Sequence, residues 1–251
     1  MARASDSSDR FASTRPEKDP KQADLQSGGT ENLAQALQRL RDDECVAFPT
    51  ETVWGLAACA LSRRAIEHLC AWKGRREDQP ISLLVPGAAG LEEMGFQLSA
   101  EACGLMDEFW PGPLTLVLPC THVFPRGIAR SDGAVGLRCS PHPVAAELSQ
   151  AAYEAGLGPL TATSLNRSGE PPARSEAEAR NLCGPGPEAP YVLRPRGPAI
   201  EEGSPSTVLD LSGATPEVLR IGAIPAEKIY SSQALRVSAS RDVSPSGEEQ
   251  E

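Results

Sequence analysis

The chain has 251 residues, of which 40% are hydrophobic, and a formal net charge of −10 at pH 7. This length is enough to bury a sizeable core as one large domain or two small ones. The acidic balance argues against nucleic-acid binding driven by overall charge, although it leaves room for a local groove lined by arginine. No segment approaches the roughly 20 apolar residues needed to cross a bilayer, so we expect a soluble, cytoplasmic protein without membrane contact.

The two ends of the chain differ in composition from its middle. Residues 1–28 are rich in Ser, Asp, Lys and Gln and contain no apolar run, which predicts a disordered tail and excludes a signal peptide or membrane anchor. Residues 231–251 are similar, so we predict a second disordered tail and one domain over 29–230. The seven cysteines form no C-x-x-C pair, which argues against a disulfide framework and a structural zinc site.

Helices and strands alternate along the predicted domain. Apolar residues recur at helical spacing in some segments and form continuous buried-type runs in others. Helices are predicted over about 33–42, 62–73, 99–109, 142–155 and 175–182, and strands over 45–48, 81–85, 114–118, 135–139, 160–164 and 207–211. Prolines and glycines predict a surface loop over 184–205. Strands mixed with helices indicate an α/β or α+β sheet whose loops carry function.

Polar residues interrupt the apolar pattern just after several predicted strands. These segments cover 48–56, 73–80, 135–142 and 161–169. They supply many hydrogen-bond donors and few general bases, at strand ends where backbone amides are also free to meet a ligand. The sequence contains no Walker A loop, H-E-x-x-H pair, nucleophile elbow or kinase signature. We therefore predict electrostatic chemistry, in which arginine, lysine and hydroxyl groups hold a polyanionic ligand.

Lys73 is the only lysine between Lys21 and Lys228, in a chain that otherwise uses arginine for positive charge. Lysine is a compact point charge whose three donors can follow a moving oxyanion, whereas arginine is a planar fork suited to bidentate contacts. The pair Lys73 and Arg75, with a glycine between them, therefore indicates an anion site. A solvated loop in an arginine-rich protein is the alternative interpretation.

The run Pro49–Leu56, read as PTETVWGL, resembles the P-T-[DE]-T-V-Y-G-L signature of the YrdC/TsaC-type threonylcarbamoyl-AMP synthases. Four later segments, in the family's order, are similar to its K-x-R, W-P-G-P-L-T, S-x-N and S-T-[IV]-x-D patterns. They begin at Lys73, Trp110, Ser164 and Ser206. The resemblance implies a single YrdC-like domain with a twisted mixed sheet, flanking helices and a concave, positively charged cleft. It also implies the short form, without the C-terminal extension domain of longer synthases.

The resemblance further implies a nucleotidyltransferase reaction. L-threonine, bicarbonate and ATP would give threonylcarbamoyl-AMP and pyrophosphate, the first step of N6-threonylcarbamoyladenosine formation at position 37 of tRNAs. Mg²⁺ would be held mainly by the ATP phosphates, with no metal site made by the protein. The implied partners are downstream tRNA-modification proteins that use the adenylate, together with a weak RNA contact.

The matching motifs also imply roles for individual residues, some with a structural alternative. The catalytic residues that they imply are Lys73 and Arg75. The implied threonine-binding residues are Thr52, His142, Ser164 and Ser206. The implied ATP-binding residues are Arg75, Gln79, Arg138, Asn166, Arg174 and Arg220. Trp54 would wall the cleft by stacking, with core packing as the alternative. Thr52 has the alternative of a satisfied strand-end hydroxyl, and His142 that of a helix cap or core residue.

The sequence departs from the family's pattern at two places near these residues. Gln79 stands where the family has asparagine, and the family's R-x-P-x-H reads here Arg138-Cys139-Ser140-Pro141-His142. Two other functions stay open: a double-stranded-RNA-binding or ribosome-associated module, and a carbamoyl-transfer domain of the same fold. The second class carries an acylphosphatase segment and zinc-finger cysteine pairs, neither of which is present in this sequence.

Overall fold

The computed structural model describes residues 32–194 and 204–236, and its strands form two sheets. The four-stranded sheet has the order β7 (Thr163–Ser164), β2 (Gly55–Ala57), β1 (Val46–Phe48), β8 (Tyr191–Val192). The six-stranded sheet has the order β10 (Glu217–Arg220), β9 (Thr207–Asp210), β4 (Leu114–Leu118), β5 (Val135–Arg138), β3 (Leu83–Leu84), β6 (Leu160–Thr161). The pairs β1/β8, β3/β5 and β4/β9 are parallel and the others antiparallel, which confirms the predicted mixed α/β fold.

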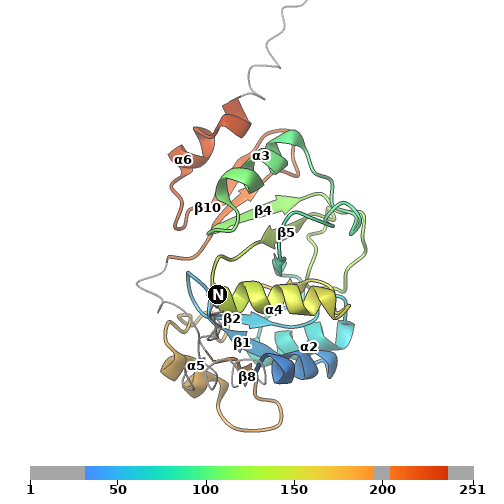
Figure 1. Ribbon diagram of the computed structural model, residues 1–251, viewed down its shortest axis with the longest axis vertical. Coiled ribbons are helices and arrows are strands. Elements are labelled where there is room, and N and C mark those ends of the chain that lie inside the picture. The colour runs from blue at the N-terminus through green and yellow to red at the C-terminus, as the bar shows by residue number, and fades with distance from the viewer. Residues whose placement is uncertain (1–31, 195–203, 237–251) are drawn as a thin grey trace, which may run out of the picture.

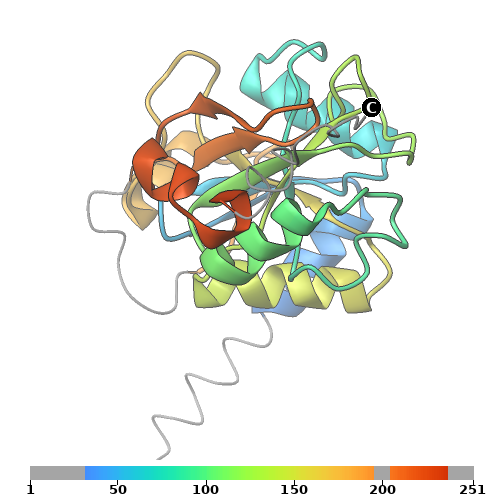
Figure 2. The same ribbon diagram turned by 90° about the horizontal axis from the view of Figure 1, so that it is seen from above.

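The helices cover the outside of these sheets (Figure 1). They comprise a helix over 32–41, α2 (Arg63–Lys73), α3 (Ala100–Phe109), α4 (Pro143–Glu154), α5 (Glu176–Cys183) and α6 (Ala226–Tyr230). Figures 1 and 2 place α3 and α6 next to each other beside the larger sheet, and Ala234 packs against Gly104 of α3. Ser62 caps the start of α2, because its side chain accepts a hydrogen bond from the backbone of Ala65.

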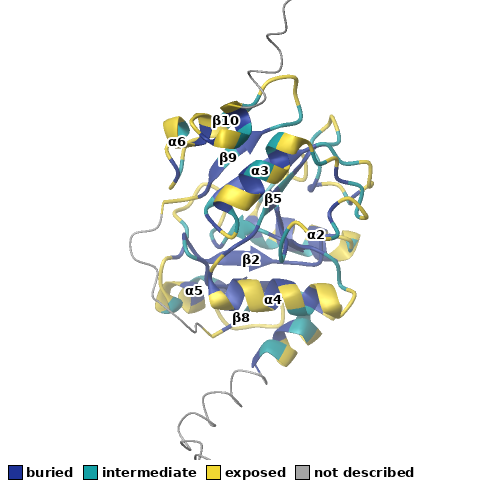
Figure 3. Cartoon of the chain, turned by 45° about the horizontal axis from the view of Figure 1, so that its top comes forward, coloured by how far each residue is buried: buried dark blue, intermediate teal, exposed yellow. Residues whose placement is uncertain are grey.

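One hydrophobic cluster includes buried side chains from both sheets. In Figure 3 the strands β2 and β9 are mostly buried, whereas α3, α4 and α6 present exposed residues outward. Trp54 and Phe48 are among its largest side chains. Each fully buried large apolar side chain stabilises the fold by about 1.5–3 kcal/mol, so this shared cluster holds the two sheets together.

The prediction of a single strand over 160–164 is wrong, because the chain changes sheets within it. Residues before Ala162 pair with β3 in the larger sheet, and residues after it pair with β2 in the smaller one. The Ala162 amide donates to the carbonyl of Ser82 at 2.6 Å. The Thr161 hydroxyl accepts from the amide of Ala58 at 2.9 Å. This crossing segment therefore fastens one sheet to the other.

The predicted surface loop over 184–205 contains a strand. Tyr191 and Val192 form β8, which pairs with β1, and the Tyr191 hydroxyl donates to the side chain of Asn32 at 2.5 Å. The surrounding prolines and glycines mask this two-residue strand in the sequence. Residues 195–203 lie outside the described part of the chain.

The boundary predicted at residue 230 is too early. Residues 231–236 are described, and Leu235 is 8% exposed and belongs to the hydrophobic cluster. A single leucine in a polar context gave too weak an apolar pattern to predict this packing. The predicted tail over 1–28, and the part of the second tail over 237–251, lie outside the described residues.

Two further features concern the described residues alone. None of their helices is long and apolar enough to cross a membrane. No three of their His, Cys, Asp or Glu side chains gather closely enough to hold a metal ion. All seven cysteines are free thiols.

Candidate active site

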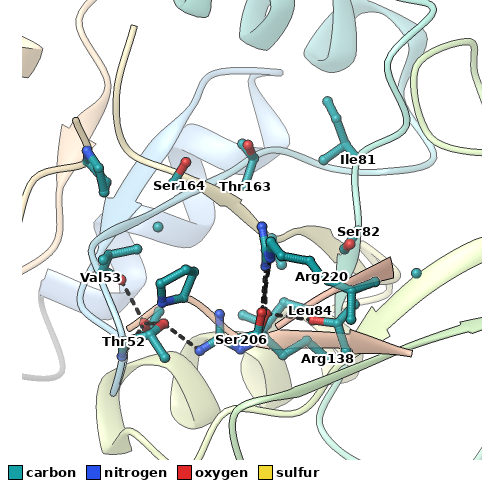
Figure 4. A pocket seen from close by; sticks show the side chains of 18 of the residues that line it. Thr52, Val53, Ile81, Ser82, Leu84, Arg138, Thr163, Ser164, Ser206 and Arg220 are labelled. Carbon is teal, nitrogen blue, oxygen red and sulfur yellow. Dashed lines mark hydrogen bonds between the residues drawn. The ribbon is translucent and has the colours of Figure 1, made fainter. Parts of the chain in front are cut away.

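An open cavity of about 560 Å³ lies where the two sheets meet (Figure 4). Strands of both sheets line it, among them β1, β2 and β7 of the smaller sheet and β4, β5, β9 and β10 of the larger one. Its lining includes five arginines and seven hydroxyl side chains: Arg75, Arg130, Arg138, Arg174, Arg220, Thr50, Thr52, Ser82, Thr115, Thr163, Ser164 and Ser206. No Asp or Glu side chain of the described residues lines the cavity. The cavity therefore presents donors and positive charge to anything that enters it.

The structure brings most of the predicted site residues to this cavity. Seven of them line it: Thr52, Arg75, Arg138, Ser164, Arg174, Ser206 and Arg220. Four do not: Lys73, Gln79, His142 and Asn166. The motif residues therefore gather around one cavity, although four of them do not present their side chains to it.

Lys73 is the last residue of α2, as predicted, but it does not lie open in a polar cleft. It is only 3% exposed, and its Nζ donates to the carbonyl oxygens of Ser164 at 2.5 Å and Asn166 at 3.0 Å, and to Asn166 Oδ1 at 2.9 Å. An ammonium group has three donors, so all of them are used. Burial, and next the charge of Arg75, lowers the pKa of Lys73 to about 8.

Arg75 reaches the cavity because Gly74 ends α2 in the left-handed conformation, at φ 63°. The Arg75 guanidinium donates to the carbonyl of Gln79 at 3.3 Å and to that of Pro80 at 2.9 Å. Burial lowers the pKa of Arg75. Gln79 itself is exposed and outside the lining, so its backbone serves the site rather than its side-chain amide.

Arg138 joins the end of β5 to the loop after β1. Its Nη2 donates to Glu51 Oε1 at 2.6 Å and to Thr52 Oγ1 at 2.7 Å. The Ser140 hydroxyl donates to the other oxygen of Glu51. The Nε of Arg138 is buried and has no hydrogen-bond partner among the described residues. An unsatisfied buried donor is costly, so Arg138 carries an uncompensated polar group behind the cavity lining.

The hydroxyls of Thr50 and Thr52 have a fixed order of donors. The Thr50 hydroxyl donates to the carbonyl of Val53 at 2.7 Å, and the two threonine hydroxyls are 3.0 Å apart. Because each hydroxyl carries one proton, Thr52 must donate to Thr50. Thr52 Oγ1 also accepts from Arg138, so toward the cavity it can act only as an acceptor.

Ser206 and Arg220 form a second cluster, which lies close to Thr52 and Arg138 in Figure 4. The Arg220 guanidinium donates to the Ser206 carbonyl at 2.8 and 3.1 Å and to its hydroxyl at 3.1 Å. The hydroxyls of Ser206 and Thr115 are 2.9 Å apart. Burial, and next the charge of Arg138, lowers the pKa of Arg220. The two arginines are therefore close enough to repel each other.

Four of the remaining predicted residues have distinct positions. Asn166 accepts from Lys73 and from the Ser164 hydroxyl at 2.7 Å, so it supports the lining from behind. Arg174 is exposed, and its guanidinium has no ion-pair partner within the described chain. His142 is 4% exposed and caps α4 through Nδ1, which accepts from Val144, in agreement with the predicted alternative of a cap. Trp54 is 2% exposed, so it is a core residue that also borders the cavity.

Two charged residues at this site were not among the predicted site residues, although Arg130 is one of the arginines that could form the predicted local groove. Arg130 lines the cavity and is held by Asp132, Asp210 and Ser212, the last two at 2.5 and 2.8 Å. The hydrogen bond that the Asp132 carboxylate accepts from Arg130 lowers the pKa of Asp132 to about 2. Arg130 lies outside every recognised motif, so only its partner Asp210, in the S-T-[IV]-x-D pattern, gave a signal. Glu51 lies inside the first motif, but its partner Arg138 is 87 residues further along the chain, so the sequence gave no sign of their contact.

The fold and site define an α/β protein with an arginine- and hydroxyl-lined cavity between two sheets. The model of the Sua5/YciO/YrdC family, described as "Telomere recombination", matches residues 38–222. The chain belongs to this family.

Relatives with assigned names are similar over most of the chain. It is 37% identical over 191 residues to a threonylcarbamoyl-AMP synthase of Pyrococcus abyssi, covering 76% of this chain and 54% of that protein. It is 30% identical over 190 residues to one of Pseudomonas putida, covering 76% of this chain and 97% of that protein. The crystal structure of P. abyssi Sua5 complexed with L-threonine superimposes with a TM-score of 0.71 at 34% identity, covering 80% of this chain and 57% of that one. The chain thus spans about half of the archaeal relative and nearly all of the bacterial one.

Proposed function

We propose that this protein is a threonylcarbamoyl-AMP synthase, which makes threonylcarbamoyl-AMP and pyrophosphate from L-threonine, bicarbonate and ATP. The observation that carries the proposal is a cavity lined by five arginines and seven hydroxyls and by no carboxylate of the described chain. A carbamate and a triphosphate are both anions, so bringing them together requires this balance of charge. The relatives named above support the proposal.

The reaction needs two bond-forming steps. The threonine amine attacks the carbon of bicarbonate, and loss of water leaves a carbamate. A carbamate oxygen then attacks the α-phosphorus of ATP, and the bond from that phosphorus to the bridging oxygen breaks to release pyrophosphate. The protein has no general base in the cavity lining, so it contributes by positioning and by stabilising negative charge.

Thr52 suits the threonine amine, because its hydroxyl can offer only an acceptor to the cavity. Ser164 and Ser206 are the further threonine contacts that we propose. Arg138, whose side chain lines the cavity, offers positive charge to a phosphate or carbamate oxygen. Arg75, Arg174 and Arg220, which have no carboxylate partner among the described residues, take the nucleotide phosphates.

Lys73 acts with Arg75 as the catalytic cation in this proposal. Its three donors are used in the ligand-free protein, so binding must exchange at least one carbonyl acceptor in the 164–166 segment for a ligand oxygen. Until then Lys73 contributes positive charge from behind Ser164. Asn166 shares this position and shapes the segment.

Magnesium enters as part of the ATP substrate. The described residues contain no acidic cluster that could enclose the ion, and Mg²⁺ keeps phosphate and water ligands in many sites of this type. The cavity hydroxyls are the protein groups nearest in character to its preferred oxygen ligands.

The product is a mixed anhydride and so transfers its acyl group readily. We infer downstream proteins that pass the threonylcarbamoyl group to an adenosine of tRNA, and hence a cytoplasmic location. A weak RNA contact through the exposed arginines remains part of the proposal.

The test is to incubate the purified protein with Mg–ATP, threonine and bicarbonate, omitting each in turn. We expect pyrophosphate release that requires all of them and no RNA, with threonylcarbamoyl-AMP detected by mass spectrometry. Serine lacks one methyl group and should react about 10–200-fold less efficiently. Pyrophosphate release without threonine, or a nucleotide product only with carbamoyl phosphate, would favour carbamoyl transfer. No nucleotide chemistry together with tight, salt-sensitive RNA binding would favour the RNA module.

A further inference from the structure

Glu51 connects three segments near the cavity. Its own side chain does not line the cavity. One carboxylate oxygen accepts from Arg138 at 2.6 Å, and the other accepts from the Ser140 hydroxyl. Ser140 in turn accepts from the amide of His142 at 3.2 Å. The loop after β1, the end of β5 and the start of α4 thus meet at one carboxylate.

This ion pair differs from the surface pairs of the protein in burial. The Arg138 and Glu51 side chains are 11% and 20% exposed, whereas those of Arg63 and Glu67 on α2 are 86% and 46% exposed. A partly buried, charge-assisted hydrogen bond fixes geometry more strongly than an exposed one, because water competes less and screening is weaker.

Arg138 needs such a partner because another cation lies near it. Its charge acts on Arg220 across the cavity, and the two guanidinium groups repel each other. Without a carboxylate behind it, Arg138 would be free to turn away from Arg220 toward solvent. Its buried and unpartnered Nε would then no longer be held beside the cavity.

We propose that Glu51 is a positioning residue, which acts through Arg138 and holds its guanidinium in the cavity lining, where it meets an anionic group of the substrate. This proposal rests on the proposed function. Ser140 is the second anchor of Glu51, and it is particular to this chain, since the family's pattern has proline at this position. Glu51 itself does not line the cavity.

The test compares Glu51→Gln, Arg138→Gln and the double variant in a binding assay with a non-hydrolysable ATP analogue, Mg²⁺ and threonine. We expect Glu51→Gln to weaken binding of one of these ligands by about 10–100-fold, the effect of a misplaced positioning group. In the Arg138→Gln background the same change should have almost no effect, because the group that it positions is gone. Ser140→Ala should weaken binding in the same direction by only a few-fold.

Glu44→Gln is the matched control, since Glu44 forms an ion pair with Arg39 at 2.5 Å away from the cavity lining. It should leave binding unchanged. Equal losses from Glu51→Gln in both backgrounds would overturn the proposal and assign Glu51 a merely structural role. Unchanged ligand binding in a folded Glu51→Gln variant would also overturn the proposal. If Glu51→Gln does not fold, unchanged binding in Ser140→Ala would do the same.

A ligand-free measurement separates this proposal from the proposed function. In the wild type the ¹⁵Nε–H resonance of Arg138 should be that of an ordered side chain, and in Glu51→Gln it should become averaged by motion. An Arg138 resonance that stays ordered in the variant would contradict the positioning role, whatever reaction the protein catalyses. Failure of the wild type to make threonylcarbamoyl-AMP would contradict the proposed function instead.

Discussion

Lys73 and Arg220 are both predicted site residues, but they satisfy their hydrogen bonds in different ways. Lys73, at the end of α2, is 3% exposed and donates to three oxygens of the 164–166 segment. Arg220, on β10, lines the cavity, and all its hydrogen bonds among the described residues go to Ser206. An arginine has five donors, so Arg220 still has N–H groups for a ligand. Burial therefore makes Lys73 a part of the fold as well as of the site.

The largest expected effect is that of Lys73→Met. This change removes the charge and leaves three buried acceptors without their donor, which we expect to lower the free energy of unfolding by about 1–3 kcal/mol. The melting temperature should fall by several degrees, and synthase activity should fall by about 10³-fold. Thermal unfolding and pyrophosphate release measure the two effects.

Lys73→Arg sharpens this prediction. The planar guanidinium group of arginine is too large for the space between the three acceptors that now surround the Lys73 Nζ. Activity should therefore also be lost, although the positive charge is kept. A Lys73→Met variant with unchanged melting temperature and most of its activity would contradict the placement of Lys73 in both fold and site.

Arg220→Gln should affect activity and leave stability almost unchanged. It removes a cation whose donors face the cavity, and we expect kcat/KM to fall by about 10²-fold. Steady-state kinetics should be compared with those of Arg180→Gln, which removes an arginine from an exposed pair on α5 and should behave as the wild type. A fall in melting temperature as large as that of Lys73→Met would remove the contrast between the two cations.

Thr52→Val tests the acceptor assigned to the threonine amine. The two side chains have nearly the same shape. Of the three hydrogen bonds of the Thr52 hydroxyl, with Thr50, Arg138 and the threonine amine, only the last involves a substrate, so KM for threonine should rise about 10-fold with little change in KM for ATP. Kinetics with each substrate varied in turn measure both constants. Equal rises for the two substrates would mean that Thr52 acts only through Arg138.

The last prediction concerns pH. The pKa of Lys73 is about 8 in the folded protein against 10.5 in the unfolded chain. The unfolded chain therefore binds more protons between these values, and the contribution of Lys73 to stability rises as pH increases from about 8 to 10.5. Activity should decrease over the same window, because the ammonium charge is lost. The difference in melting temperature between wild type and Lys73→Met, measured below and above pH 8, should show this rise. A pH-independent difference would contradict it.

Strand positions were predictable where apolar runs were long, and the strand Leu114–Leu118 agrees in both bounds. The split of residues 160–164 was not predictable, because side-chain pattern alone does not say which sheet a strand joins. The motifs predicted residues that come together in the fold, since seven of the named residues line one cavity. They did not reveal the burial of Lys73 or the role of Glu51. Both depend on contacts between segments about 90 residues apart in the chain.

The most direct test of the account is to supply bicarbonate labelled with ¹³C and to weigh the nucleotide product. If the cavity joins a carbamate to ATP, the product should contain threonine and AMP and be heavier by the mass of one neutron than the product from unlabelled bicarbonate. A threonine-containing adenylate without the label would mean that the threonine carboxylate attacks ATP directly. That result would contradict the synthase proposed here.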